Sequence, residues 1–272
     1  MSDFLQQMAK SSAERASMVS RSFTAADLEQ PLQALALNGF DVIAELKDRS
    51  PAAGELATSD GKRGERALQY VSGGAAAISV LTEPSRFAGA LTHLRDVVAA
   101  IEAQPVPVMR KDFLVEPVQI LEARAAGASG VLLIAAILTD QQLANMLDCA
   151  SEQSMFVLLE AFDEKDLRRC AKLLESAGRL RQAEDRKLLF GVNTRNLRTL
   201  EVDRTRLNKL SPLLPPGVVN VAESGVQCAD DAARAAAAGY SMALVGTALM
   251  QSAKPDRLLG EMLSAGRQQV AA

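Results

Sequence analysis

The chain has 272 residues, a formal net charge of −3 and 48% apolar residues. This length suits one large α/β barrel or two smaller domains, and we expect one domain over residues 1–272. The basic residues are dispersed, which argues against a nucleic-acid partner or an anionic membrane surface, because both need clustered positive charge. A phosphorylated small molecule stays open as a ligand, since a few local cations and backbone amides can hold one phosphate.

The N-terminal stretch, residues 1–40, is expected to form extra helices that cover one end of the fold. Its sequence MSDFLQQMAKSSAERASMVS lacks the apolar core of a secretory signal, and no run in the chain reaches the length of a transmembrane helix. We therefore expect a cytoplasmic protein without a membrane partner.

Eight short apolar runs alternate with helical segments between residues 42 and 250. Most are continuous, as expected for parallel strands covered on both faces. The runs are Val42–Leu46, Ala77–Leu81, Val106–Arg110, Gly130–Ile134, Met155–Glu160, Leu188–Asn193, Val218–Glu223 and Met242–Val245. The pattern predicts an α/β fold, a single (β/α)8 TIM barrel with an N-terminal helical extension. A doubly wound open sheet is the alternative, but no G-x-G-x-x-G follows the first run.

A weak internal repeat supports the barrel. Three alanine-rich helical segments end in Gly74, Gly127 and Gly239, each followed by a strand. We predict left-handed helix caps at these glycines. A charged insertion, Arg179–Lys187, precedes the sixth strand and is interpreted as a solvated loop, with a partner-binding surface as the alternative.

The cysteines and the lone histidine narrow the chemistry. Cys149, Cys170 and Cys228 show no C-x-x-C spacing and have no histidine neighbour, so they predict neither a disulfide framework nor a metal site. His93 lies in the surface-like helical pattern ALTHLRDVV, where we expect it to be solvated. Proton transfer must then fall to carboxylates and lysines.

Charged residues stand where the apolar runs end. Glu45 and Lys47 close the first run, Lys111 the third, Glu160 the fifth and Glu223 the seventh. Buried strands do not carry unpaired charge cheaply, and the carboxyl ends of barrel strands meet at one face. These residues therefore predict one pocket, although a salt bridge that seals the barrel mouth is the alternative for the first pair.

Two lysines in one pocket would raise each other's cost of protonation, which can pull one pKa towards a value suited to acid catalysis. The segment GVNTRNL adds Asn193 and Arg195, an amide suited to hydroxyls and a guanidinium suited to a carboxylate. Phe113, after Lys111, is either rim packing or a wall against an aromatic ligand.

The loops after the last two strands are candidates for a phosphate site. Ser224 and Gly225 follow the seventh strand, and Gly246 and Thr247 follow the eighth. Loops in these positions of a barrel often hold a phosphate with backbone amides. Ordinary strand-to-helix turns are the alternative.

These motifs resemble the indole-3-glycerol phosphate synthase family. The resemblance runs from about Val42 to Met250 and rests on AELKDRSP, AAAISVLTEPSRFAGALTHLR, PVMRKDFLVEPVQILEARAAGASGVLLIAAIL, GVNTRNLRTLEVD, VAESGV and ALVGTALM. It implies closure of an indole ring on 1-(2-carboxyphenylamino)-1-deoxyribulose 5-phosphate, with release of carbon dioxide and water and without a metal or organic cofactor. Ala52 departs from the family, which commonly has a second serine there.

The resemblance also implies roles for the site residues. Lys111 looks like the general acid of ring closure, and Glu160 like the carboxylate of the dehydration step. Lys47 looks like a phosphate and substrate contact that can donate a proton, with Glu45 orienting it. The remaining matches are Asn193 and Glu223 at the sugar hydroxyls, Ser50 and Arg195 near the substrate carboxylate, Phe113 and Leu133 beside the aromatic ring, and Ser224, Gly225, Gly246 and Thr247 at the phosphate.

Other functions stay open from the residues alone. Another sugar-phosphate barrel, either an isomerase or an aldolase that forms a Schiff base on Lys47 or Lys111, would use similar strand ends. A catalytically idle barrel could instead bind a partner through the insertion. Association with another enzyme of the pathway, or a weak homo-oligomer, is likewise left open.

Overall fold

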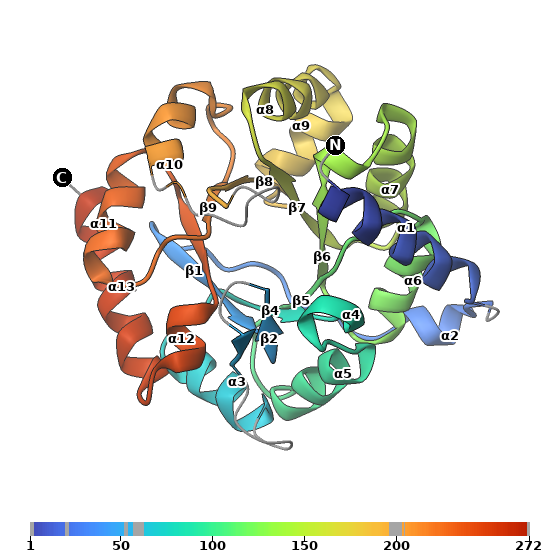
Figure 1. Ribbon diagram of the computed structural model, residues 1–272, viewed down its shortest axis with the longest axis horizontal. Coiled ribbons are helices and arrows are strands. Elements are labelled where there is room, and N and C mark those ends of the chain that lie inside the picture. Colours follow the sequence, from blue (N-terminus) through green and yellow to red (C-terminus); the bar gives the residue numbers. More distant parts are fainter. Residues whose placement is uncertain are drawn as a thin grey trace.

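The computed structural model describes residues 3–19, 22–51, 54–56, 63–195, 203 and 205–270. Eight parallel strands close into a barrel in the order β1-β10-β9-β8-β7-β6-β5-β4 (Figure 1). The strands are β1 (Asp41–Leu46), β4 (Ala77–Leu81), β5 (Val108–Lys111), β6 (Gly130–Ile134), β7 (Phe156–Ala161), β8 (Leu188–Asn193), β9 (Asn220–Glu223) and β10 (Met242–Val245). The predicted TIM barrel is confirmed.

Helices surround the barrel and cover the outer faces of its strands (Figure 1). They are α3 (Arg63–Ser72), α4 (Pro84–Phe87), α5 (Leu91–Ala100), α6 (Pro117–Ala125), α7 (Asp140–Glu152), α8 (Glu164–Ala171), α9 (Ala177–Glu184), α10 (Thr205–Leu210), α11 (Ala229–Ala237), α12 (Thr247–Gln251) and α13 (Pro255–Val270). Short 3₁₀ turns lie at η1 (Ala135–Ile137), η2 (Lys172–Glu175) and η3 (Ser211–Leu213). Because the strands are covered outside and packed inside, continuous apolar runs encode them.

Three helix ends use left-handed glycines, as predicted. Gly74, Gly127 and Gly239 have φ values of +92°, +89° and +93°. Glycine adopts this conformation at little cost, so each helix can stop and turn into the following strand.

The parallel register brings the ends of neighbouring strands to one level. Leu81 pairs with Lys111, Ile134 pairs with Glu160, and Asn193 pairs with Glu223. Polar side chains from strands distant in the sequence therefore meet at the carboxyl face of the barrel.

The N-terminal extension contains α1 (Asp3–Ser17) and α2 (Ala25–Leu28). Leu5, Met8, Ser12 and Ala16 are buried at helical spacings of three and four residues, which gives α1 one packed face. Arg15, in its last turn, contacts Asp112 directly after β5, so α1 lies at the mouth of the barrel as expected.

The predicted loop at Arg179–Lys187 is wrong. Most of the segment belongs to α9, whose Ala183 is buried. Arg179 Nη2 lies 2.5 Å from Asp148 Oδ1, and Gln182 Nε2 donates to Ser151 Oγ at 2.7 Å, so the helix is tied to α7. Arg179, Arg181 and Glu184 belong to a surface helix, and Asp185–Lys187 form the turn that leads into β8.

His93 is less exposed than predicted. Its side chain is 17% exposed, and its Nδ1 lies 3.6 Å from Asp48 Oδ2, which also accepts a hydrogen bond from Arg63 Nη2 at 2.6 Å. The partner stands in the loop after β1, so the helical pattern around the histidine could not reveal it. That loop also forms a small antiparallel pair, β2 (Arg49–Ser50) and β3 (Gly54–Glu55), which the sequence did not indicate. Ala52 lies outside the described residues.

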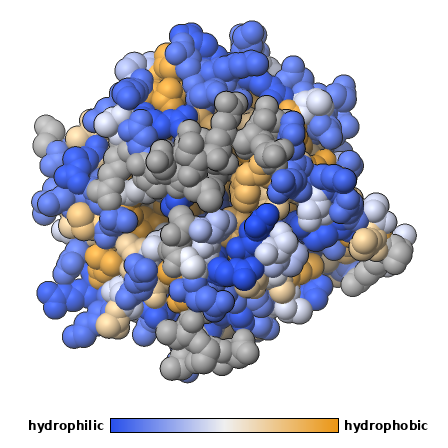
Figure 2. Space-filling view, in the orientation of Figure 1, coloured by the Kyte–Doolittle hydropathy of each residue, from blue (hydrophilic) through white to orange (hydrophobic). Residues whose placement is uncertain are grey.

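Figure 2 shows apolar residues towards the hollowed centre of the face in Figure 1, with hydrophilic residues around them. Among the described helices, we find none with both the length and the apolar character needed to span a membrane.

Candidate active site

A cavity of about 470 Å³ opens at the carboxyl ends of the strands. Its lining includes every predicted site residue except Leu133, namely Glu45, Lys47, Ser50, Lys111, Phe113, Glu160, Asn193, Arg195, Glu223, Ser224, Gly225, Gly246 and Thr247. Charged groups from β1, β5, β7 and β9 thus converge on one pocket, as the strand-end pattern predicted.

Lys111, Glu160 and Glu223 form a compact group, which we call the charged triad. The Lys111 Nζ lies 3.3 Å from Glu160 Oε2 and 3.4 Å from Glu223 Oε2. Burial alone would lower the pKa of Lys111, but the carboxylates of Glu160, Glu223 and Glu45 outweigh it and raise that pKa above its usual value. The expected lowering is therefore wrong for this lysine, whose raised pKa favours the protonated form.

The pKa of Glu223 differs from that of an ordinary surface carboxylate. Burial, followed by the charge of Glu160, raises its pKa well above the usual range. Two buried carboxyl groups next to one ammonium leave an excess of negative charge, so the pair favours keeping one proton. Within the described part of the chain, Glu223 Oε1 has no hydrogen-bond partner.

Gly191 in β8 makes room for that carboxyl group. A Cβ atom at this position would clash with Glu223 Oε1 and lie 3.1 Å from Glu223 Cδ. The glycine therefore permits the Glu223 side chain to lie against β8 within reach of Lys111.

Glu45 and Lys47 form a second ion pair, with 2.6 Å between Glu45 Oε1 and Lys47 Nζ. Burial would raise the pKa of Glu45, but the positive charges of Lys47, Lys111 and Arg195 together lower it, so Glu45 stays ionised. Gly246 faces the pair, and a Cβ there would clash with Glu45 Oε1 and lie 2.8 Å from Lys47 Nζ. Since both charges line the open pocket, the pair does not simply seal the barrel mouth.

The loop after β9 lines the pocket with Ser224 and Gly225. Ser224 and Gly225 have φ values of +66° and +83°, and left-handed backbone is unfavourable for serine. Thr194 stabilises the turn, because its Oγ1 donates to Ser224 O at 3.0 Å and its amide donates to Glu223 O at 2.9 Å. Backbone amides exposed in a turn can form a concave set that suits an anion.

Asn193 and Arg195 lie beside the triad on the strand end of β8. Asn193 Oδ1 accepts a hydrogen bond from the Arg195 backbone amide at 2.9 Å, which fixes the amide side chain. Burial lowers the pKa of the Arg195 guanidinium, and the nearby Glu45 opposes this effect. The residues that follow in the GVNTRNL segment, 196–202, lie outside the described residues.

Leu133 does not line the pocket, so this assignment is wrong. The register pairs Ile134 with Glu160, and Leu132 and Ile134 both line the cavity. Side chains alternate along a strand, so Leu133 points to the outer face of β6, where it is fully buried. The resemblance located the right strand but the wrong face.

Sequence reasoning missed two aromatic residues of the pocket, Phe4 and Phe87. Phe4 belongs to α1, and Phe87 ends α4 within the EPSRFAG segment. Neither stands at the end of a barrel strand, so the strand-end pattern gave no signal for them. Among the described residues, no group of three or more His, Cys, Asp or Glu side chains could hold a metal ion.

One known protein family matches almost the whole chain. A model of the indole-3-glycerol phosphate synthase family matches residues 3–262. The chain belongs to this family. The indole-3-glycerol phosphate synthase of Parafrankia sp. (strain EAN1pec) is 42% identical over 240 residues, which cover 88% of this chain and 84% of the relative. The enzyme of the same name from Nocardioides sp. (strain ATCC BAA-499 / JS614) is 45% identical over 224 residues, which cover 82% and 80%.

Solved structures support the fold of this indole-3-glycerol phosphate synthase family member. The 3-hexulose-6-phosphate synthase of Salmonella typhimurium aligns with a TM-score of 0.61 at 14% identity, over 84% of this chain and 99% of that one. Thiamine phosphate pyrophosphorylase of Pyrococcus furiosus gives 0.56 at 14% identity, over 86% and 97%. At this identity the likeness concerns the barrel alone.

Proposed function

We propose that the chain is an indole-3-glycerol phosphate synthase that uses the charged triad for proton transfer. It converts 1-(2-carboxyphenylamino)-1-deoxy-D-ribulose 5-phosphate to indole-3-glycerol phosphate, carbon dioxide and water. The observation that carries the assignment is the position of the Lys111 ammonium group between two buried carboxyl groups, in a pocket with an aromatic lining.

Ring closure needs a proton on the ketone oxygen of the substrate. Lys111 supplies it, because the surrounding carboxylates keep the ammonium protonated until the substrate arrives. The ring carbon that bears the carboxylate then forms the new carbon–carbon bond, and loss of carbon dioxide returns the electron pair to the ring.

Dehydration follows at the former ketone carbon. Its hydroxyl group leaves as water after gaining a proton, and the neighbouring methylene carbon, which is bonded to the anilino nitrogen, loses a proton as the indole double bond forms. Glu160, which lies beside Lys111, is the carboxylate that acts in this step. Lys47, oriented by Glu45, is a second proton donor and a contact for the substrate.

The remaining pocket residues bind and orient the substrate. Asn193 and Glu223, whose carboxyl pKa is raised, suit the sugar hydroxyls, and Arg195 and Ser50 suit the substrate carboxylate. The phosphate is assigned to the turns at Ser224–Gly225 and Gly246–Thr247, which line the same pocket.

The Schiff-base alternative is less well supported. A nucleophilic lysine needs a neutral amine, whereas the raised pKa of Lys111 favours the charged form. Borohydride treatment in the presence of substrate tests it, and a covalent adduct on Lys47 or Lys111 would favour an aldolase.

The direct test is turnover of the anilino-ribulose phosphate by the purified protein. We expect a product with indole fluorescence, together with release of carbon dioxide. A folded preparation, checked by circular dichroism, that forms no indole product would contradict the proposal. The cytoplasmic location, the single-domain organisation and any association with a pathway enzyme or a second copy stay predictions.

A further inference from the structure

Three phenylalanines from distant parts of the chain line the pocket together. Phe4 lies on α1, Phe87 at the end of α4, and Phe113 two residues after Lys111. The ring centroids of Phe4 and Phe113 are 6.0 Å apart at an interplanar angle of 78°, and those of Phe87 and Phe113 are 6.2 Å apart at 36°. These separations are typical of interacting aromatic pairs. We call Phe4, Phe87 and Phe113 the aromatic wall.

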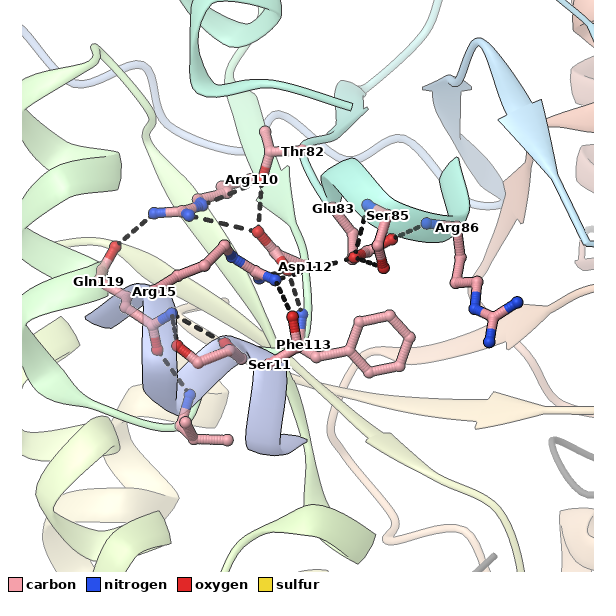
Figure 3. A network of polar contacts seen from close by, with 12 residues as sticks. Ser11, Arg15, Thr82, Glu83, Ser85, Arg86, Arg110, Asp112, Phe113 and Gln119 are labelled. Carbon is pink, nitrogen blue, oxygen red and sulfur yellow. Dashed lines mark hydrogen bonds and ion pairs between the residues drawn. The ribbon is translucent and has the colours of Figure 1, made fainter. Parts of the chain in front are cut away.

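One guanidinium group lies where the elements that carry this wall meet. Arg15 Nη2 donates to Asp112 Oδ1 at 2.7 Å, and Arg15 Nη1 lies 3.8 Å from Glu83 Oε1 (Figure 3). The Asp112 and Glu83 side chains are only 1% and 0% exposed, whereas that of Arg15 is 26% exposed. A planar, always charged guanidinium can contact both carboxylates from the edge of the barrel mouth.

Each carboxylate also fixes the backbone next to a wall residue. Asp112 Oδ1 accepts the backbone amide of Phe113 at 2.8 Å. Glu83 caps α4, because its two oxygens accept the amides of Ser85 at 2.9 Å and Arg86 at 2.7 Å, directly before Phe87 (Figure 3). Since Phe4 and Arg15 belong to the same helix, all three wall segments connect to Arg15.

Other contacts hold the surrounding structure without Arg15. Asp112 Oδ2 accepts a hydrogen bond from Thr82 Oγ1 at 2.9 Å and lies 3.3 Å from Arg110 Nη2. Gln119 Nε2 donates to Ser12 Oγ on α1 at 2.8 Å. A variant without the guanidinium therefore leaves the buried Asp112 paired and α1 anchored at Ser12, so the barrel should still fold.

We propose that Arg15 is a positioning residue that holds α1, α4 and the loop after β5 in register, and so assembles the aromatic wall against which the aromatic ring of the substrate packs. Arg15 itself does not line the pocket and acts through the segments that it joins. The substrate part of the inference rests on the proposed function, but the attachment of α1 does not.

Hydrogen–deuterium exchange tests the attachment without any substrate. In Arg15→Met, amides of α1 should exchange at least about tenfold faster than in the unmodified protein, with the barrel strands unchanged. Arg179→Met is the matched control, because it removes another partly buried Arg–Asp pair, at 2.5 Å, that ties α9 to α7. It should leave α1 unaffected. Unchanged exchange of α1 in Arg15→Met would overturn the proposal.

Steady-state kinetics tests the effect on the wall. Arg15→Met should raise KM about tenfold and change kcat by less than about threefold, because the wall contacts the ring in both the ground state and the transition state. Arg15→Lys keeps the positive charge but loses the two-pronged guanidinium group, so its KM should lie between those of Arg15→Met and the unmodified protein. The KM of Arg179→Met should match that of the unmodified protein.

A double-mutant cycle with Phe4→Ala separates positioning from a general structural effect. If Arg15 acts through the wall, Arg15→Met should change KM by less than about twofold when Phe4 is already absent. An equal change in both backgrounds would overturn the proposal. If the unmodified protein forms no indole product, the proposed function fails, while the exchange experiment still decides the attachment of α1.

Discussion

The charged triad and the aromatic wall line the same pocket but are built in different ways. Lys111, Glu160 and Glu223 stand at the ends of three barrel strands, so the register of the sheet fixes their separation. Phe4 stands on α1, of 15 residues, and Phe87 on α4, of four, both outside the barrel, and ion pairs and caps bring them to Phe113. In the proposed function the two parts have different tasks: the sheet holds the groups assigned to proton transfer, and its attachments hold the groups assigned to binding of the aromatic ring.

Removal of the Lys111 ammonium should have the largest effect on the reaction. Lys111→Met is expected to lower kcat about a thousandfold while KM changes far less, because a general acid acts in the transition state. Lys209→Met removes an exposed lysine, 3.7 Å from Asp203, and should leave kcat unchanged. If Lys111→Met changed KM but not kcat, the lysine would serve substrate binding. The assignment of proton transfer to the triad and of binding to the wall would then be wrong.

A pair of substitutions in β6 tests which face of the strand belongs to the pocket. Leu133→Ala should lower the free energy of unfolding by about 3 kcal/mol through the cavity left among the outer helices, with KM unchanged. Ile134→Ala should raise KM, because that side chain lines the pocket. Denaturant titrations and steady-state kinetics on both variants check this. A KM increase confined to Leu133→Ala would restore the original assignment.

Gly191 offers a way to disturb the triad without touching its members. Gly191→Ala should push the Glu223 carboxyl group away from Lys111, since the added Cβ clashes with Glu223 Oε1, and kcat should fall about tenfold or more. In a Glu223→Ala background the same substitution should cost less, because the clash with the carboxyl group is gone and only the contact with Leu158 Cδ1, at 3.1 Å, remains. Gly260→Ala is the control, since an added Cβ there meets nothing within 4 Å. Equal kcat losses in both backgrounds would refute the positioning role of Gly191.

The sequence predicted the barrel and the triad for one physical reason. Apolar runs mark strands that are covered on both faces, and charge tolerated at their ends marks the carboxyl face. The eight predicted strands match the observed ones to within two residues, and Glu45, Lys111 and Glu160 meet as expected. Local patterns were sufficient here because the closed sheet leaves little freedom in how its strand ends meet.

The misses concern contacts between elements that lie far apart in the sequence. The pocket assignment of Leu133 is one residue away from Leu132 and Ile134, which line the cavity, and a shift of one residue along a strand moves a side chain to the opposite face. His93 was expected to be solvated because its partner Asp48 stands outside its own helix. Phe4 and Phe87 carry no strand-end signal, and their place in the pocket depends on the ion pairs of Arg15. Local periodicity does not contain this information.

The smallest predicted effect concerns stability and tests whether Glu223 carries a proton. Its pKa in the folded protein is raised, so the folded state binds the proton more tightly than the unfolded chain, and stability is lost as the pH rises from the ordinary carboxyl range through the raised pKa. Glu223→Gln cannot ionise and should escape this loss. Its melting temperature should equal that of the unmodified protein in the ordinary carboxyl pH range and exceed it by a growing margin as the pH rises above that range. Glu164→Gln, at an exposed surface pair, should show no such growth with pH. A constant difference across the pH range would mean that Glu223 is ionised throughout, and the triad would then hold two carboxylate charges against one ammonium.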